Sequence, residues 1–105
     1  MRAAVIDIGS NSVLLLVGER TETGWRTLLD TARITRLGEG FSAEKTLQPH
    51  AIERTLQVID EYLETCRSLG VEQVIIVATA VVREARNQEA FAEQVKQRLH
   101  KQARL

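Results

Sequence analysis

The sequence has 105 residues, enough for one domain, which excludes an enzyme with separate substrate and cofactor domains within this length. Hydrophobic residues make up 44% and charged residues 27%, a composition typical of a folded globular protein rather than a disordered chain. Fourteen Lys and Arg residues balance fourteen Asp and Glu residues, so we expect no DNA partner and no membrane partner, and any bound anion needs a local site.

Two apolar runs near the N-terminus predict a β-hairpin. Residues 3–8 carry apolar side chains at consecutive positions, which is typical of a strand buried on both faces. The turn residues Gly-Ser-Asn-Ser follow at 9–12, and Gly9 is expected to supply unusual backbone angles. Residues 13–17 resume the apolar run directly, which indicates that the two strands pair.

A second turn signal extends the hairpin to a three-strand antiparallel meander. Thr-Glu-Thr-Gly at residues 21–24 leads to residues 25–29, a weaker and more polar strand candidate. From residue 33 to residue 46 the periodicity fails, and this stretch is predicted to be a loop.

A long amphipathic helix is predicted next. Pro49 suits the first helical position, Leu47 can pack against Ile52, and Gly70 suits the left-handed position that ends a helix. The apolar side chains at three- and four-residue spacing are Ile52, Leu56, Ile59, Leu63 and Cys66. This spacing gives the helix one apolar face.

The last third of the sequence predicts a buried strand at residues 74–78, a short helix at 80–86 and a final helix capped by Asn87. The apolar side chains of the final helix are Phe91, Val95 and Leu99. A strand, a long helix and a second strand in this order place the first and fourth strands parallel through a right-handed crossover. The predicted fold class is therefore α/β, a three-strand antiparallel meander plus a parallel fourth strand packed with two main helices, without an internal domain boundary.

Cysteine content and apolar run length set further limits. One cysteine, Cys66, permits no internal disulfide and no cysteine-based zinc cluster, and it is expected to be inert core. His50 and His100 are far apart and are expected to be solvated. The apolar runs are far shorter than the roughly 20 residues that span a bilayer, and no leader precedes them, so we expect a cytoplasmic protein.

An acidic residue inside the first strand marks the strongest candidate site. Asp7 lies in an apolar strand beside the turn at residues 9–12, and a buried carboxylate without a partner is costly. The backbone N–H groups of this turn and the side chains of Ser10, Asn11 and Ser12 can all donate hydrogen bonds, and several converging donors form an anion site. Spacing alone leaves open the alternative that Asp7 caps its own turn and the serines face water.

Arg83 is the second candidate, because it lies just past the end of the fourth predicted strand. Ligands of open α/β sheets bind outside the carboxyl ends of parallel strands, so Asp7 and Arg83 are expected at the same edge of the sheet. The Gly-Glu-Gly stretch at 38–40 lacks a preceding apolar strand and an immediate helix, which favours a flexible loop over a dinucleotide site. The sequence also has no Gly-x-x-x-x-Gly-Lys-Ser/Thr stretch, and a P-loop is excluded.

Four segments together resemble one known family across nearly the whole chain. They are AVIDIGSNSV (residues 4–13), ITRLGEG (34–40), PHAIERT (49–55) and VATAVVREARN (77–87). In order and spacing they are similar to the N-terminal half-domain of the exopolyphosphatase/guanosine pentaphosphate phosphohydrolase (Ppx/GppA) family. That family belongs to the actin, sugar kinase and Hsp70 ATPase superfamily, so the resemblance implies a ribonuclease H-like half-domain and a single incomplete N-terminal domain over residues 1–105.

The resemblance implies a site and a reaction. Gly9, Ser10, Asn11, Ser12 and Arg83 match the family's phosphate-binding positions. Asp7 matches a position near the catalytic Mg²⁺. The implied reaction is attack of water on a terminal phosphoryl group of inorganic polyphosphate or guanosine pentaphosphate, with charge neutralised by the metal.

Departures from the family pattern leave two hypotheses. Leu14 stands where the family usually has a basic residue or His, and Ala80 where it often has Ser. The sequence ends before the family's Ser-Gly-x-Glu-Glu-Ala stretch, which supplies the catalytic carboxylate, and before its second glycine-rich phosphate loop, so no catalytic residue is assigned here. The chain is then either the phosphate-binding part of a phosphoanhydride hydrolase or a non-catalytic phosphate-binding or interaction module, with self-association expected through the strand at residues 74–78.

Overall fold

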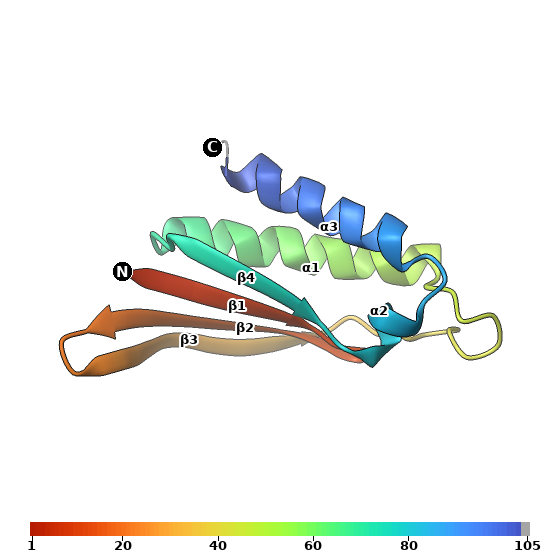
Figure 1. The fold of residues 1–105 in the computed structure, drawn as a ribbon, viewed down its shortest axis with the longest axis horizontal. Coiled ribbons are helices and arrows are strands. Elements are labelled where there is room, and N and C mark those ends of the chain that lie inside the picture. Colours follow the sequence, from red (N-terminus) through yellow and green to blue (C-terminus); the bar gives the residue numbers. More distant parts are fainter. Residues whose placement is uncertain (104–105) are drawn as a thin grey trace.

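A computed structural model describes residues 1–103 of the protein as a four-stranded mixed sheet with its two long helices on one side (Figure 1). The elements in chain order are β1 (Arg2–Ile8), β2 (Ser12–Thr21), β3 (Gly24–Ile34), α1 (Pro49–Ser68), β4 (Gln73–Ala78), α2 (Ala80–Glu84) and α3 (Gln88–Ala103). The strand order is β3-β2-β1-β4, with β1 parallel to β4 and the other pairs antiparallel. The predicted α/β class and strand arrangement are confirmed.

The second hairpin is longer than the sequence predicted. β3 continues to Ile34, where it pairs with Ser12, so the prediction of a loop from residue 33 is wrong at its start. The additional residues, 30–34, contain three polar and two apolar side chains, without the continuous apolar run or strict alternation that would identify a strand. Pairing with β2 determines their conformation, and β-propensity depends on such cross-strand neighbours.

The end of α1 follows the predicted glycine signal. Gly70 has a φ of +68°, which is the left-handed conformation expected of it. The N–H of Gly70 donates to the carbonyl of Arg67 at 3.1 Å, and the N–H of Val71 donates to the carbonyl of Cys66 at 2.9 Å. This pair of bonds is the Schellman motif, which satisfies two carbonyls at the helix end and directs the chain into β4.

The core lies between α1 and one face of the sheet. Its buried side chains on the sheet are Ala4, Ile6, Ile8, Val13, Leu15 and Val17. The buried side chains on the helices include Leu56, Ile59, Leu63, Cys66, Phe91 and Val95, as the predicted stripes required. None of the helices in residues 1–103 combines the length and apolar character that a bilayer-spanning segment needs.

The opposite face of the sheet is open in the described part of the chain. Its large apolar side chains, each more than two fifths exposed, are Leu14, Leu16, Trp25, Ile34, Ile75 and Val77. The prediction that β1 and β4 are buried on both faces is therefore wrong for residues 1–103. The reason is topological, because α1 and α3 lie on the same side of the sheet (Figure 1).

Asn87 does not cap α3 with its side chain, contrary to the sequence prediction. Its Oδ1 accepts a hydrogen bond from the N–H of Leu47 at 2.9 Å, and its Nδ2 donates to the carbonyl of Leu47 at 3.0 Å. The amide has one acceptor and two donors, so it can satisfy both backbone groups of one residue. This contact joins the start of α3 to the segment that precedes α1.

Tyr62 provides a test of the packing between α1 and β2. Its hydroxyl donates to the carbonyl of Val13 at 3.0 Å and is buried, and this burial raises the pKa of Tyr62. A raised pKa in the folded state means stability that is present below the ordinary value of about 10 and is lost as the pH rises above it.

We expect Tyr62→Phe to lower the free energy of unfolding by about 1–3 kcal/mol near neutral pH, because the buried hydrogen bond from the hydroxyl to the Val13 carbonyl is lost. The difference in stability from wild type should shrink at about pH 11, because the side chain at position 62 can ionise there in wild type but not in the variant. Urea unfolding at the two pH values measures this. A difference that stays constant with pH would contradict the assigned role of the hydroxyl.

Candidate functional site

The turn between β1 and β2 is tight because two backbone groups approach closely. The N–H of Gly9 donates to the carbonyl of Ser12 at 2.9 Å. A Cβ at Gly9 would lie 3.0 Å from that carbonyl oxygen, so the backbone of the turn would have to shift to accept a side chain. The φ of Gly9 lies outside the left-handed region, so the expectation of unusual backbone angles is wrong. Glycine is needed here for space.

The turn presents unused hydrogen-bond donors. Within residues 1–103, the side chains of Ser10, Asn11 and Ser12 make no hydrogen bond, and the N–H groups of Ser10 and Asn11 have no carbonyl partner. Ser10 and Asn11 are exposed, and Ser12 is half-buried at the start of β2. A group of free donors at the carboxyl end of a strand can bind an oxyanion.

Asp7 lies on the open face, one residue before the end of β1. Its cross-strand neighbours are Leu14 on β2 and Val77 on β4, both apolar. Its Oδ1 atom is buried and has no hydrogen-bond partner among residues 1–103. A carboxylate oxygen in this state fits a hard cation such as Mg²⁺, which binds one or two carboxylates and completes its shell with water and phosphate.

Asp7 is the acidic ligand that this edge offers to such an ion, through its unpartnered Oδ1 atom. No group of three or more His, Cys, Asp and Glu side chains lies close enough to hold a metal within residues 1–103. The residues present therefore fit a metal that is shared with a phosphate ligand and water. They do not form a metal site of protein ligands alone.

Arg83 extends from α2 to the end of β4. Its Nη1 donates to the carbonyl of Ala78 at 3.0 Å, and Ala78 pairs with Ile8 in the parallel ladder. Thr79 holds the two strand ends together, because its N–H and its hydroxyl both donate to the carbonyl of Ile8, at 3.1 and 3.3 Å. The prediction that Asp7 and Arg83 lie at the same edge of the sheet is confirmed.

The segment after β3 also belongs to this edge, which the sequence did not predict. The N–H groups of Thr35 and Arg36 donate to the carbonyl of Asn11 at 3.0 and 3.1 Å, and the N–H of Gly38 donates to the carbonyl of Ser10 at 2.9 Å. The Gly-Glu-Gly stretch is a loop, as expected, but hydrogen bonds fasten it to the turn. Gly38 was the available signal, since a Cβ there would lie 3.3 Å from the Cβ of Ser10.

Leu14, where the resemblance expects a basic residue, lies directly beside the candidate site. It pairs with Asp7 across the β1–β2 ladder, and its side chain is exposed on the open face. Arg83 bonds the end of β4, which pairs with the end of β1 where the turn begins. The neutral donors and the guanidinium at this edge can bind phosphate, and the carboxylate can bind a cation that accompanies it.

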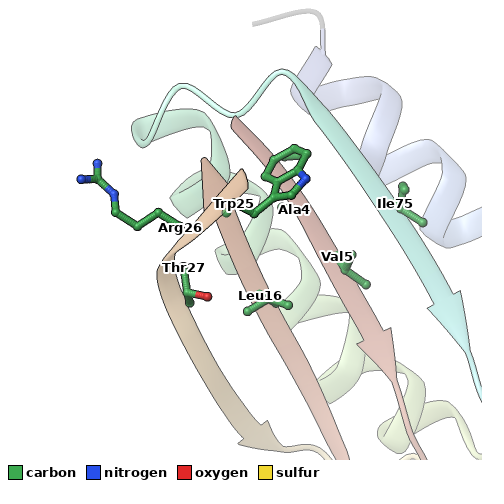
Figure 2. A pocket seen from close by; sticks show the side chains of 9 residues that line it. Ala4, Val5, Leu16, Trp25, Arg26, Thr27 and Ile75 are labelled. Carbon is green, nitrogen blue, oxygen red and sulfur yellow. The ribbon is translucent and has the colours of Figure 1, made fainter. Parts of the chain in front are cut away.

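A separate hollow of about 260 Å³ lies on the open face, toward the other end of the strands. Figure 2 shows Leu16, Val5 and Ile75 in a row across three neighbouring strands, with the ring of Trp25 at one side. Gly18 lies against that ring, and a Cβ there would be in ordinary contact with an indole carbon at 3.5 Å. The hollow is apolar, and it offers a contact surface rather than a site for an anion.

Comparison with known proteins identifies relatives over nearly the whole chain. Residues 16–104 match the model of the Ppx/GppA phosphatase family; this range includes Arg83 and begins after the turn at residues 9–12. A guanosine-5'-triphosphate,3'-diphosphate pyrophosphatase of Aliivibrio fischeri is 33% identical over 94 residues, 90% of this chain and 19% of the relative. Exopolyphosphatase 1 of Mycobacterium bovis is 31% identical over 97 residues, 91% of this chain and 28% of the relative.

Solved structures agree in fold. A Ppx/GppA phosphatase of Aquifex aeolicus matches with a TM-score of 0.90 and 39% identity, over 95% of this chain and 33% of that protein. An exopolyphosphatase of Cytophaga hutchinsonii has the same fold, with a TM-score of 0.90 at 24% identity, over 94% of this chain and 32% of that protein. The chain thus spans about a third of the length of these solved proteins. It belongs to the Ppx/GppA phosphatase family.

Proposed function

We propose that residues 1–105 form a single incomplete N-terminal domain, the phosphate-binding portion of a phosphoanhydride hydrolase. The substrate of the whole enzyme would be inorganic polyphosphate or guanosine pentaphosphate, which are the substrate classes that the relatives' names indicate. The observation that carries the proposal is the turn of unused donors at the carboxyl end of β1, with Arg83 fixed at the same edge. One buried free cysteine supports a cytoplasmic location.

Each residue of the edge receives a role in this proposal. The side chains of Ser10, Asn11 and Ser12 and the free N–H groups of Ser10 and Asn11 hold phosphate oxygens, and Arg83 neutralises their charge. Gly9, whose own N–H bonds the Ser12 carbonyl, shapes the turn that presents these donors. The unpartnered Oδ1 atom of Asp7 is the ligand that we assign to Mg²⁺. The bound ion would supply charge neutralisation of the phosphoryl group.

Because no residue of this chain matches the family's general base, we expect the isolated 105-residue chain to release little or no phosphate from polyphosphate in the presence of Mg²⁺. A phosphate-release assay alongside a longer family member measures this. Turnover comparable with that of the longer protein would refute this division of roles.

Phosphate binding by the isolated chain tests the proposal directly. In a ¹⁵N–¹H NMR titration, inorganic phosphate should shift the amide signals of residues 9–13. Ser10→Ala and Asn11→Ala should each weaken the response by about tenfold, the equivalent of one hydrogen bond to a charged group. Ser68→Ala is the matched control, because Ser68 is exposed at the far end of α1 and should leave the affinity unchanged.

Shifts confined to surface lysines, with residues 9–13 silent, would contradict the proposal. They would favour the alternative in which the turn only closes the hairpin. We expect the isolated chain to bind phosphate and short polyphosphate weakly, because one turn and one arginine form only one side of a two-sided site.

The second candidate function, an interaction module, has an observation of its own. β4 is an edge strand of the described sheet, and it carries Ile75 and Val77 on the open face beside the hollow of Figure 2. Unpaired strand edges and contiguous apolar faces both promote association. We propose that the isolated chain self-associates through β4, and the Discussion gives the expected result.

A further inference from the structure

The orientation of the phosphate-binding turn depends on the segment at residues 35–38. A peptide group is planar, and its C=O and N–H point in opposite directions. The carbonyl of Ser10 accepts from Gly38, so the N–H of Asn11 must point the other way. The carbonyl of Asn11 accepts from Thr35 and Arg36, which directs the N–H of Ser12 in the same manner. Three hydrogen bonds from residues 35–38 thus determine the direction of two N–H groups of the turn.

Arg54, on α1, holds that segment in place. Its Nε donates to the carbonyl of Thr35 at 2.9 Å, and its Nη2 donates to the carbonyl of Arg36 at 3.3 Å. The same Nη2 donates to Oε1 of Glu39 at 2.9 Å. One planar guanidinium therefore binds three acceptors of a single loop, a geometry that a lysine ammonium cannot reproduce.

The loop needs this support because one of its residues has an unfavourable conformation. Arg36 has a φ of +51°, in the left-handed region that non-glycine residues rarely adopt. Such a conformation persists only where surrounding contacts determine it. The two carbonyls that Arg54 binds belong to Arg36 and to the residue before it, so the guanidinium brackets the strained position.

The ion pair with Glu39 has a smaller part. Arg54 and then His50 lower the pKa of Glu39 by hydrogen bonding, and His50 Nε2 lies 3.0 Å from the same carboxylate oxygen. The Arg54 and Glu39 side chains are 41% and 44% exposed, and ion pairs at this exposure contribute little. The bonds to backbone carbonyls are therefore the important ones.

We infer that Arg54 is a positioning residue for the anion-binding turn, acting through residues 35–38 without touching the ligand. The inference rests on the proposed function for its ligand, and on the hydrogen bonds of Arg54 and of residues 35–38 for its geometry. It predicts that loss of the guanidinium loosens the turn and weakens phosphate binding, whereas loss of the Glu39 carboxylate does neither.

The first measurement needs no phosphate. In Arg54→Gln, amide hydrogen exchange at Thr35, Arg36 and Gly38 should accelerate, because these N–H groups bond the turn. Exchange at Ile6 in the core should not change. The exchange pattern distinguishes local loosening of the turn from global unfolding. Equal acceleration at Ile6 would overturn the inference, because Arg54 would then act only on overall stability.

The second measurement is the NMR titration with inorganic phosphate. Arg54→Gln and Arg54→Lys should both weaken binding by about tenfold, since neither side chain can span the three acceptors. Glu39→Gln should bind as wild type does. Arg67→Gln is the matched control on the same helix, where the arginine pairs with Glu64 at 3.8 Å, and it should also bind normally.

The two measurements distinguish an error in the proposed function from an error in the positioning role of Arg54. If wild type does not bind phosphate at residues 9–13, the proposed function is wrong, and the exchange data still test whether Arg54 holds the turn. If wild type binds and Arg54→Gln keeps both its exchange rates and its affinity, the positioning role is wrong. A loss of affinity in Glu39→Gln equal to that in Arg54→Gln would assign the effect to the ion pair instead and also refute the inference.

Discussion

The isolated chain is expected to associate as its concentration rises. β4 ends the sheet on one side, and its outward side chains Ile75 and Val77 are 48% and 43% exposed. They continue an apolar surface formed by Leu14 and Leu16 on β2. Exposed apolar surface and unpaired edges drive association at micromolar to millimolar concentrations, so sedimentation velocity should show the average mass increasing across that range.

A charged substitution on the open side of β4 should prevent this association. Ile75→Lys places an ammonium at the edge without entering the core, and lysine is a residue that natural edge strands use for this purpose. Ile76→Lys is the wrong variant for this test, because Ile76 packs against the core beside α3. Gln97→Lys, on the exposed side of α3, is the control for added charge and should associate as wild type does.

A chain that stays monomeric up to about millimolar concentration would refute self-association through β4. Association that survives in Ile75→Lys would assign the contact to another surface, and Trp25→Ser would then test the hollow shown in Figure 2.

The order of the elements was predictable because their boundaries have local chemical causes. Gly70 ends α1 through its left-handed backbone, and Pro49 begins it, so the long helix could be located from single residues. The strands that precede and follow such a helix in the sequence can pair in few ways, because crossovers between parallel strands are right-handed. The parallel pairing of β1 with β4 followed from those rules.

Local signals did not predict how many faces of the sheet the helices cover. Consecutive apolar residues in β1, β2 and β4 favour burial on both faces, yet both long helices lie on one side in residues 1–103. The pattern of a strand reports what its side chains prefer to contact. It does not report which segment provides the contact.

The candidate site was predicted only in part for a related reason. Asp7, the turn at 9–12 and Arg83 were found because strand ends meet at one edge of a sheet. The support of the turn by Gly38 and Arg54 depends on contacts between residues 15 to 28 positions apart in the chain, and no local pattern encodes them. Almost any residue type can form hydrogen bonds through the backbone of a loop, so the sequence does not reveal these bonds. Glycine, where two segments of backbone pack closely, is the exception.

The largest effect on stability is expected from the core face of β2, and the same strand contains its own control. Leu15 has 0% exposure and Leu16, the next residue, has 45%. Leu15→Ala should lower the free energy of unfolding by about 2–5 kcal/mol, because it removes buried methyl groups and leaves a cavity between β2 and α1. Leu16→Ala deletes the same atoms from the open face and should cost about 1 kcal/mol or less.

Urea unfolding of both variants at low micromolar concentration, where association is weakest, measures the two costs. Stability of a small domain is about 5–15 kcal/mol, so Leu15→Ala should remove a large part of it and shift the midpoint well below that of Leu16→Ala. Equal losses in the two variants would mean that the face carrying Leu16 is covered in solution. Since Leu16, Val5 and Ile75 form one row across β2, β1 and β4, that outcome would also identify the covered surface as the one that Ile75→Lys is designed to disrupt.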